Sequence, residues 1–339
     1  MPSRLEQYQP YIERELKFSI RPIEPSAEGL YRMIRYFLGW EDEKGRAVND
    51  PKLRGKRWRP VTSLLVAEAV GGGHQAAIPF AVAIELFHNY TLIHDDVEDH
   101  DEFRRHRPTV WKVFGLEQAI NTGSGLHVLA HKTVEEADHP RALKILQVME
   151  TAWLEVHEGQ YLDMSFEQRD DVTEEEYLTM NSLKTGALVR TAAEAGAMAA
   201  TDDKSLIAQY RAFGLELGNA YQVFDDINSV WSTSKDTGKA AAGDIRKKKK
   251  TLPFIYSLRR LSQGGRKRLL AIYSKEKVTD VDVKTVIRLF EAAGAYDFCL
   301  KLGNEFKKKT LQLLDKTGAH GQPKDDLIDL VNTITHLNN

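Results

Sequence analysis

The chain has 339 residues, of which 42% are hydrophobic and 28% charged, and its 47 Lys and Arg nearly balance its 49 Asp and Glu. Such a composition excludes a disordered or collagen-like chain, and a net charge of -2 argues against a general nucleic-acid binder, which needs a basic surface to neutralise phosphates. The only cysteine, Cys299, cannot form an internal disulfide, so we expect a reducing compartment, the cytoplasm.

Apolar residues recur with helical spacing along most of the chain. The first stripe runs over Leu30–Leu38, where apolar side chains occupy positions i, i+3, i+4, i+7 and i+8. A helix is expected from Pro60 to Val70, because proline suits a first helical turn and glycines follow Val70. Further helices are expected over Gln75–Asp99, over Arg141–Phe166, after a capping box of Thr173 and Glu176, and from Thr201 through Phe224.

No run of alternating β-branched residues is present, so strands have little support. We find no repeat of fixed period and predict an all-α protein with one domain over residues 1–339. The N-terminal stretch Met1–Phe18 lacks the apolar core of a signal peptide, and the longest apolar stretch, Ala76–Phe87, is interrupted by Glu85. We therefore expect no transmembrane segment.

Two aspartate clusters stand at the ends of apolar helices. In the first, Asp95 and Asp99 lie four residues apart and share a helix face, with Asp96 about 100° round the axis. Like charges at a helix C-terminus repel each other, so a cation should compensate them. In the second, Asp225 and Asp226 follow another strongly apolar helix. Two acidic clusters that face each other and offer only oxygen ligands suit Mg²⁺, which bridges carboxylates to substrate phosphates.

Cations are concentrated near these clusters. Isolated loop lysines and arginines are usually solvated, but here they flank the carboxylates and one helix start, where backbone N–H groups also favour an anion. They are Lys56, Arg57 and Arg59, then Arg104 and Arg105, then Lys184, Lys239 and the run Arg246–Lys250. Metal-binding carboxylates beside fixed cations predict a site for diphosphates.

The motifs resemble, in order, those of the trans-isoprenyl diphosphate synthase family. They are Gly55-Lys56-Arg57-Trp58-Arg59-Pro60, the segment His88–Asp99 with Arg104 and Arg105, Gly159-Gln160 with Asp163, Lys184-Thr185-Gly186, Gln222 with Asp225 and Asp226, Gly238-Lys239, and Gly243-Asp244-Ile245 with Lys249 and Thr251-Leu252-Pro253. The resemblance covers about Leu30–Arg260. It implies the isoprenoid synthase fold, a bundle of long helices around a central cavity, and a homodimer. The reaction it implies is Mg²⁺-dependent condensation of isopentenyl diphosphate with an allylic prenyl diphosphate.

The resemblance also implies roles for individual residues. Asp95, Asp96, Asp99, Asp225 and Asp226 would bind Mg²⁺, three ions with substrate present; Arg104, Lys184 and Lys239 would hold the allylic diphosphate, Lys56, Arg59, His88 and Arg105 the isopentenyl diphosphate, and Lys249 would belong to the substrate-binding set. Thr185 and Gln222 would lie near the reacting carbons and stabilise developing positive charge. One departure is Ser229, where many members carry a third Asp.

Product length should depend on the helix wall below the first cluster. Tyr90, five residues before Asp95, lies roughly 7.5 Å along the helix, with Thr91 beside it. In the family, an aromatic residue at the fifth position with a small residue at the fourth tends to accompany geranylgeranyl (C20) synthesis. We therefore expect a C20 product, with farnesyl (C15) next.

Three alternatives stay open from sequence. A class I terpene cyclase would need no second diphosphate site, so Lys56, Arg59, His88 and Arg105 argue for elongation. A di-iron carboxylate bundle could use Glu85-x-x-His88 and Glu136-x-x-His139, but it would leave the many cations unexplained. A non-catalytic subunit of a prenyl synthase is suggested by Ser229 alone.

Overall fold

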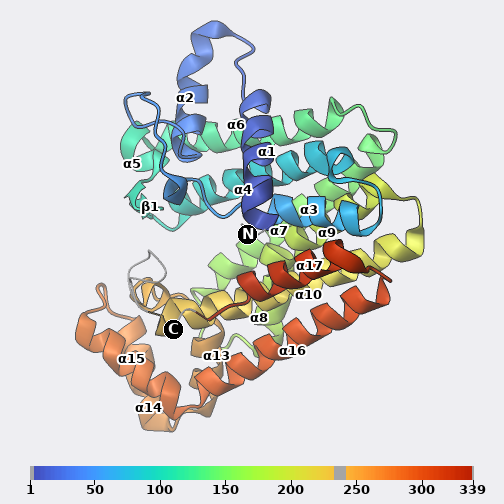
Figure 1. The fold of residues 1–339 in the computed structure, drawn as a ribbon. Helices are drawn as coiled ribbons and strands as arrows, with labels where there is room; N and C mark the ends of the chain where they lie inside the picture. Colours follow the sequence, from blue (N-terminus) through green and yellow to red (C-terminus); the bar gives the residue numbers. More distant parts are fainter. Residues whose placement is uncertain (1–3, 233–241, 338–339) are drawn as a thin grey trace. The chain divides into compact units, whose positions relative to one another are not determined.

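A computed structural model describes residues 4–232 and 242–337, which are largely helical (Figure 1). The α-helices are α1 (Arg4–Ser19), α2 (Glu28–Phe37), α3 (Trp58–Ala69), α4 (Ile78–Glu98), α5 (Val110–Phe114), α6 (Leu116–Glu135), α7 (Ala142–Phe166), α8 (Glu174–Asn181), α9 (Ala187–Ala200), α10 (Lys204–Trp231), α12 (Gly243–Arg246), α13 (Leu252–Arg260), α14 (Gln263–Tyr273), α15 (Asp280–Ala292), α16 (Ala295–Lys316) and α17 (Gly321–Ile334). Short 3₁₀ turns are η1 (Pro25–Ala27), η2 (Pro51–Leu53) and η3 (His74–Ala77), and η4 (Ser182–Gly186) is a π-helical turn. The all-α prediction is confirmed.

The chain divides into two compact units. Unit 1 comprises Met1–Thr151, Thr191–Arg211 and Gly318–Leu330, and unit 2 comprises Ala152–Arg190, Ala212–Thr317 and Val331–Asn339. The first aspartate cluster belongs to unit 1 and the second to unit 2. Two expectations therefore stay predictions: that residues 1–339 form one domain, and that the two aspartate clusters face each other.

Helix α4 forms the core of unit 1 because it is apolar around most of its circumference. Phe80, Ile84 and Phe87 are fully buried, and α4 packs along α6 and α3 (Figure 1). Gly123 on α6 permits a close approach, since a Cβ there would lie 2.3 Å from the ring of His94. Among the described residues, one helical stretch, His74–Glu98, is long and apolar enough to cross a membrane, but 67% of its apolar window is buried inside the protein.

The core of unit 2 forms around the second half of α10. Val223, Phe224 and Ile227 of α10 are buried in one cluster with Phe254 and Ile255 of α13. Helices α8, α12, α14, α15 and the start of α16 add further side chains to this cluster. The packing fixes the end of α10, where the second aspartate pair stands.

Helix boundaries agree with the sequence to within a few residues. The capping box of Thr173 and Glu176 is present at α8. Helix α10 begins at Lys204 rather than Thr201, because Asp203 Oδ1 accepts the backbone N–H groups of Ser205 and Leu206 and so caps the helix.

The structure also contains a strand pair that the sequence pattern did not predict. Strands β1 (Phe103–Arg104) and β2 (Arg107–Pro108) form a two-residue antiparallel hairpin after α4. It is too short to produce an alternating pattern.

Candidate functional site

The first aspartate cluster closes helix α4. Asp96 is 1% exposed, and its Oδ1 accepts from Arg104 Nε at 2.6 Å. Its second oxygen, Oδ2, is buried without a hydrogen-bond partner. Burial raises the pKa of Asp96 to about 7, against the lowering influence of Arg104. Asp95 and Asp99 are less buried, so the cluster combines one buried carboxylate with two accessible ones.

These carboxylates fit a hard divalent cation. They offer only oxygen ligands, and Oδ2 of Asp96 is a buried polar atom without a hydrogen-bond partner. Within residues 4–232 and 242–337, no group of three or more His, Cys, Asp or Glu side chains is arranged as a cage that could hold a metal ion. Mg²⁺ does not need such a cage, since it usually keeps several waters and binds through one or two carboxylates and substrate phosphates.

The hairpin after α4 carries three arginines, Arg104, Arg105 and Arg107. Arg105 and His106 both have positive φ, 49° and 63°, which L-residues rarely adopt. Arg107 holds the hairpin against α2 by donating to the backbone oxygens of Tyr36 and Glu41, each at 3.0 Å. Such strain persists where surrounding contacts impose it, and it is typical of functional sites. The hairpin places Arg104 against Asp96 and Arg105 toward α4.

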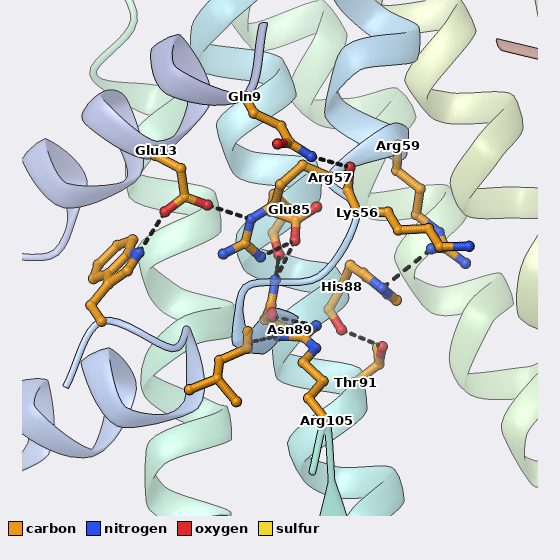
Figure 2. A network of polar contacts seen from close by, with 12 residues as sticks. Gln9, Glu13, Lys56, Arg57, Arg59, Glu85, His88, Asn89, Thr91 and Arg105 are labelled. Atoms are coloured by element: carbon orange, nitrogen blue, oxygen red, sulfur yellow. Dashed lines mark hydrogen bonds and ion pairs between the residues drawn. The ribbon is translucent and has the colours of Figure 1, made fainter. Parts of the chain in front are cut away.

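A cluster of cationic side chains lies beside α4 in unit 1, as Figure 2 shows. Arg59 Nη1 contacts His88 Nε2 at 3.3 Å, and the Arg59 guanidinium lies 4.5 Å from the ring centre of Trp58. Burial and the positive charges of Arg59 and Arg105 hold the pKa of His88 well below its usual range. Burial and then the charge of Arg57 lower the pKa of Arg105 to about 9. The group is short of negative charge, so it favours an anionic ligand.

The sequence pattern grouped Arg57 with the diphosphate-binding cations and offered Glu85 as a di-iron ligand, but in the structure both support this cluster from within the protein. Arg57 is buried between two carboxylates, Glu13 of α1 and Glu85 of α4, and Asn89 donates to Glu85 at 2.7 Å. Glu85 Oε1 accepts from both Arg57 and Asn89, so this glutamate of the di-iron alternative is engaged in a buried ion pair. One sequence signal could have revealed this support. Glu85 interrupts the apolar stretch Ala76–Phe87, and a carboxylate buried in such a helix needs a cationic partner.

In unit 2, a π-helical turn carries Lys184 and Thr185. Such turns are frequent at functional sites. A Cβ on Gly159 would lie 2.3 Å from the Lys184 backbone nitrogen, so only glycine lets α7 approach this turn. Lys184 Nζ donates to Asp163 Oδ2 at 2.5 Å. These contacts give a structural reason for three of the motif residues, Gly159, Asp163 and Lys184.

The two aspartates of the second cluster occupy different environments. Asp226 is 2% exposed and accepts from Tyr177 Oη at 2.6 Å, from Gln222 Nε2 at 2.9 Å and from the Leu252 backbone N–H at 3.0 Å. Burial raises the pKa of Asp226 to about 7, although these donors oppose the shift. Thr185 Oγ1 donates to Gln222 Oε1 at 2.9 Å, which extends the network to the π-turn. Asp225 is partly exposed beside it.

The remaining predicted residues of unit 2 are placed as follows. Ser229 Oγ donates to the backbone oxygen of Asp226 at 2.9 Å. In the cationic run, Arg246 pairs with Asp280 at 2.6 Å and Lys250 with Asp170 at 2.7 Å, and Lys249 is partly buried. Gly238 and Lys239 lie outside the described residues.

Tyr90, the predicted chain-length residue, is packed among aromatic rings. Its ring stacks on His127 of α6 at 4.8 Å between centres with 9° between planes, and it contacts His94 at 4.6 Å and Phe87 at 5.3 Å. Thr91 donates to the backbone oxygen of His88 at 2.8 Å. Tyr90 is therefore held in one position and is 8% exposed.

Comparison with known proteins places this geometry in a family. Residues 47–290 match polyprenyl synthetase. A (2E,6E)-farnesyl diphosphate synthase of Mycobacterium bovis is 35% identical over 305 residues, 89% of this chain and 84% of that protein. A geranylgeranyl pyrophosphate synthase of Geoglobus acetivorans is 34% identical over 87% of this chain and 88% of that protein.

Solved structures agree. The crystal structure of a polyprenyl synthetase from Streptomyces coelicolor has a TM-score of 0.90 and 30% identity, with 98% of each chain covered. That of a geranylgeranyl pyrophosphate synthetase from Pyrococcus horikoshii has a TM-score of 0.87 and 33% identity, covering 98% of this chain and 97% of that one. Sequence and structure together show that the chain is a member of the polyprenyl synthetase family.

Proposed function

We propose that this prenyltransferase condenses isopentenyl diphosphate with an allylic prenyl diphosphate and releases geranylgeranyl diphosphate (C20). Its relatives are named farnesyl, geranylgeranyl and short-chain isoprenyl diphosphate synthases. The observation that carries the proposal is the cationic cluster of unit 1, which lies beside α4, the helix that ends in the first aspartate cluster. A terpene cyclase, with one diphosphate to bind, has no use for that second group of cations.

The cationic cluster would bind isopentenyl diphosphate through Lys56, Arg59 and Arg105. His88 would contribute as a neutral donor. Its lowered pKa keeps the ring uncharged, and because Arg59 can only donate, the facing Nε2 accepts and the proton lies on Nδ1. This arrangement holds the diphosphate and leaves the double bond of the substrate available as the nucleophile.

The aspartate cluster would hold the allylic diphosphate. Bound Mg²⁺, for which we propose three ions, supplies a Lewis acid that stabilises the departing diphosphate. Asp95, Asp96 and Asp99 would be ligands. Asp95 and Asp99 share a helix face, and Asp96 would bind through Oδ2 while its Oδ1 accepts from Arg104. Lys184, Lys239, Lys249 and the second aspartate pair are assigned to the same diphosphate by the order of the motifs alone, with Asp225 as the accessible ligand of that pair.

Thr185 and Gln222, which we place near the reacting carbons, would act through the dipoles of their polar side chains. Departure of the diphosphate leaves an allylic cation, and attack by the double bond of isopentenyl diphosphate forms the new carbon–carbon bond. Thr185 and Gln222 are hydrogen-bonded to each other at 2.9 Å and would stabilise that positive charge. The proton lost at the end is assigned to the released diphosphate rather than to a side chain.

Replacing Tyr90 by Ser tests the product length. Serine removes the stacked ring, so products longer than C20 will form, while Tyr90→Phe keeps the ring and the wild-type product. Mass spectrometry of the products checks this. An unchanged product range in Tyr90→Ser would remove Tyr90 from this role, and a C15 ceiling in the wild type would contradict the C20 proposal.

Replacing Gly55 by Ala tests the anion site. Gly55 has φ +76°, and a Cβ there would lie 2.9 Å from Arg105 Nη2, so alanine displaces this guanidinium. We expect the KM for isopentenyl diphosphate to rise about tenfold, the loss of one charged hydrogen bond. Gly71→Ala is the matched control, since Gly71 has φ +94° with nothing within 4 Å of a Cβ. An equal KM in both variants would contradict the proposal.

We also propose that the protein is a homodimer located in the cytoplasm. Exposed apolar side chains recur on α6, where Leu116, Ile120 and Val128 are 46%, 45% and 65% exposed. A second copy would cover such a face.

A further inference from the structure

Arg57 lies in the middle of the predicted substrate-binding motif, but its side chain is buried inside the protein. Its neighbour Lys56 is exposed, whereas the Arg57 side chain is 1% exposed. Its backbone is left-handed, with φ 52° at the start of α3. A buried guanidinium and a strained backbone each cost free energy and persist only where the surroundings compensate.

Two carboxylates from different helices provide that compensation (Figure 2). Arg57 Nε donates to Glu13 Oε1 at 2.8 Å, and Nη1 donates to Glu85 Oε1 at 2.6 Å. Trp40 Nε1 donates to the other oxygen of Glu13. Glu13 stands on α1, which precedes residues 47–290, the range that matches polyprenyl synthetase.

The chain of contacts continues to the substrate-binding side. Asn89 Nδ2 donates to Glu85 Oε1 at 2.7 Å, and Arg105 Nη2 lies 3.5 Å from Asn89 Oδ1. Helix α1 also contacts the loop directly, since Gln9 Nε2 donates to the backbone oxygen of Lys56 at 3.1 Å. The charge of Arg57 acts on Arg105 and lowers its pKa, an influence that Glu85 opposes.

We propose that Glu13 on α1 is a positioning residue for the isopentenyl diphosphate site, acting through Arg57 to fix Lys56 and Arg105. This inference rests on the proposed function of that site. Glu13 touches no substrate. Glu13 holds Arg57 from the side opposite Glu85 and so fixes the loop that carries Lys56. Its negative charge also helps to neutralise Arg57, so that Arg105 does not face a second unpaired positive charge.

The test is Glu13→Gln in the full chain, which keeps the size of the side chain and removes its charge. We expect the KM for isopentenyl diphosphate, and its dissociation constant by titration calorimetry, to rise about tenfold. The KM for the allylic substrate and kcat should stay within about twofold. Glu85→Gln should act in the same direction, and the double variant should show less than the sum of the two effects, because both act on Arg57.

Two variants serve as controls. Glu15→Gln changes an α1 glutamate whose ion-pair partner is Arg14, and Asp326→Asn loosens α1 at its other end, where Arg4 Nε contacts Asp326 Oδ2 at 2.8 Å. Both should keep the wild-type KM, and Asp326→Asn should lower thermal stability. Should Glu85→Gln fail to fold, Glu13→Gln decides alone.

Two negative results would be distinguishable. A Glu13→Gln enzyme with unchanged KM, or one whose kinetic parameters change together in parallel with Asp326→Asn, would overturn the positioning role while leaving the proposed function intact. A wild-type protein that does not bind isopentenyl diphosphate at all would overturn the proposed function and this inference with it.

Discussion

Asp95→Asn will lower kcat by roughly 10³-fold at saturating substrates and Mg²⁺, because electrostatic stabilisation of a departing group is usually the largest catalytic contribution. Asp95 is the accessible carboxylate that shares a helix face with Asp99. Its buried neighbour Asp96 is engaged by Arg104. Steady-state kinetics over a range of Mg²⁺ concentrations will measure the loss.

Glu98→Gln is the matched control, since Glu98 is an exposed carboxylate at the same helix end. Its kcat should stay within about twofold of the wild type, as expected for a surface substitution. Equal losses in both variants would mean that only the summed negative charge of the helix end matters. A fully active Asp95→Asn enzyme would remove this residue from the metal site.

Asp226 and Asp225 are adjacent, but replacing each by Ala will have a different effect: Asp226→Ala will lower stability, and Asp225→Ala will lower activity. Removing Asp226 leaves the Tyr177 hydroxyl, the Gln222 amide and the Leu252 N–H without their acceptor, so the free energy of unfolding should fall by about 3–5 kcal/mol. Asp225→Ala should change it by less than about 1 kcal/mol and lower kcat roughly 10²-fold.

Chemical denaturation and steady-state kinetics on both variants will separate the two effects. Asp225→Asn keeps the size of the side chain and should match Asp225→Ala in activity, because the charge is what a metal requires. Wild-type stability in Asp226→Ala would show that its buried network is dispensable. Wild-type turnover in both Asp225 variants would show that the second cluster does not act in catalysis, as Ser229 first suggested.

Helical periodicity was sufficient to predict the helices that end in the two aspartate clusters. Helix α4 was predictable because ten of the fourteen residues from Phe80 to Ile93 are apolar, and the start of α8 because Thr173 and Glu176 form a reciprocal cap. The start of α10 was less certain, since Thr201 and Asp203 both have capping side chains and only the backbone path decides between them.

Local strain and long-range pairing could not be predicted in the same way. Arg57, Arg105 and His106 adopt positive φ without the glycine or asparagine that usually signals it. The partner of Glu85 lies 28 residues away and that of Glu13 lies 44 residues away, so no local pattern reveals them. Asp225 and Asp226 are the same residue type, and only packing around α10 distinguishes the buried one from the accessible one.

The most direct test of the central claim is mass spectrometry of the products formed from isopentenyl diphosphate. The purified protein would be incubated with dimethylallyl, geranyl and farnesyl diphosphates in separate reactions, with Mg²⁺ and with a chelator. We predict geranylgeranyl diphosphate from all three, dependent on Mg²⁺. A cyclic hydrocarbon formed without isopentenyl diphosphate, or no condensation of any allylic substrate, would contradict the account.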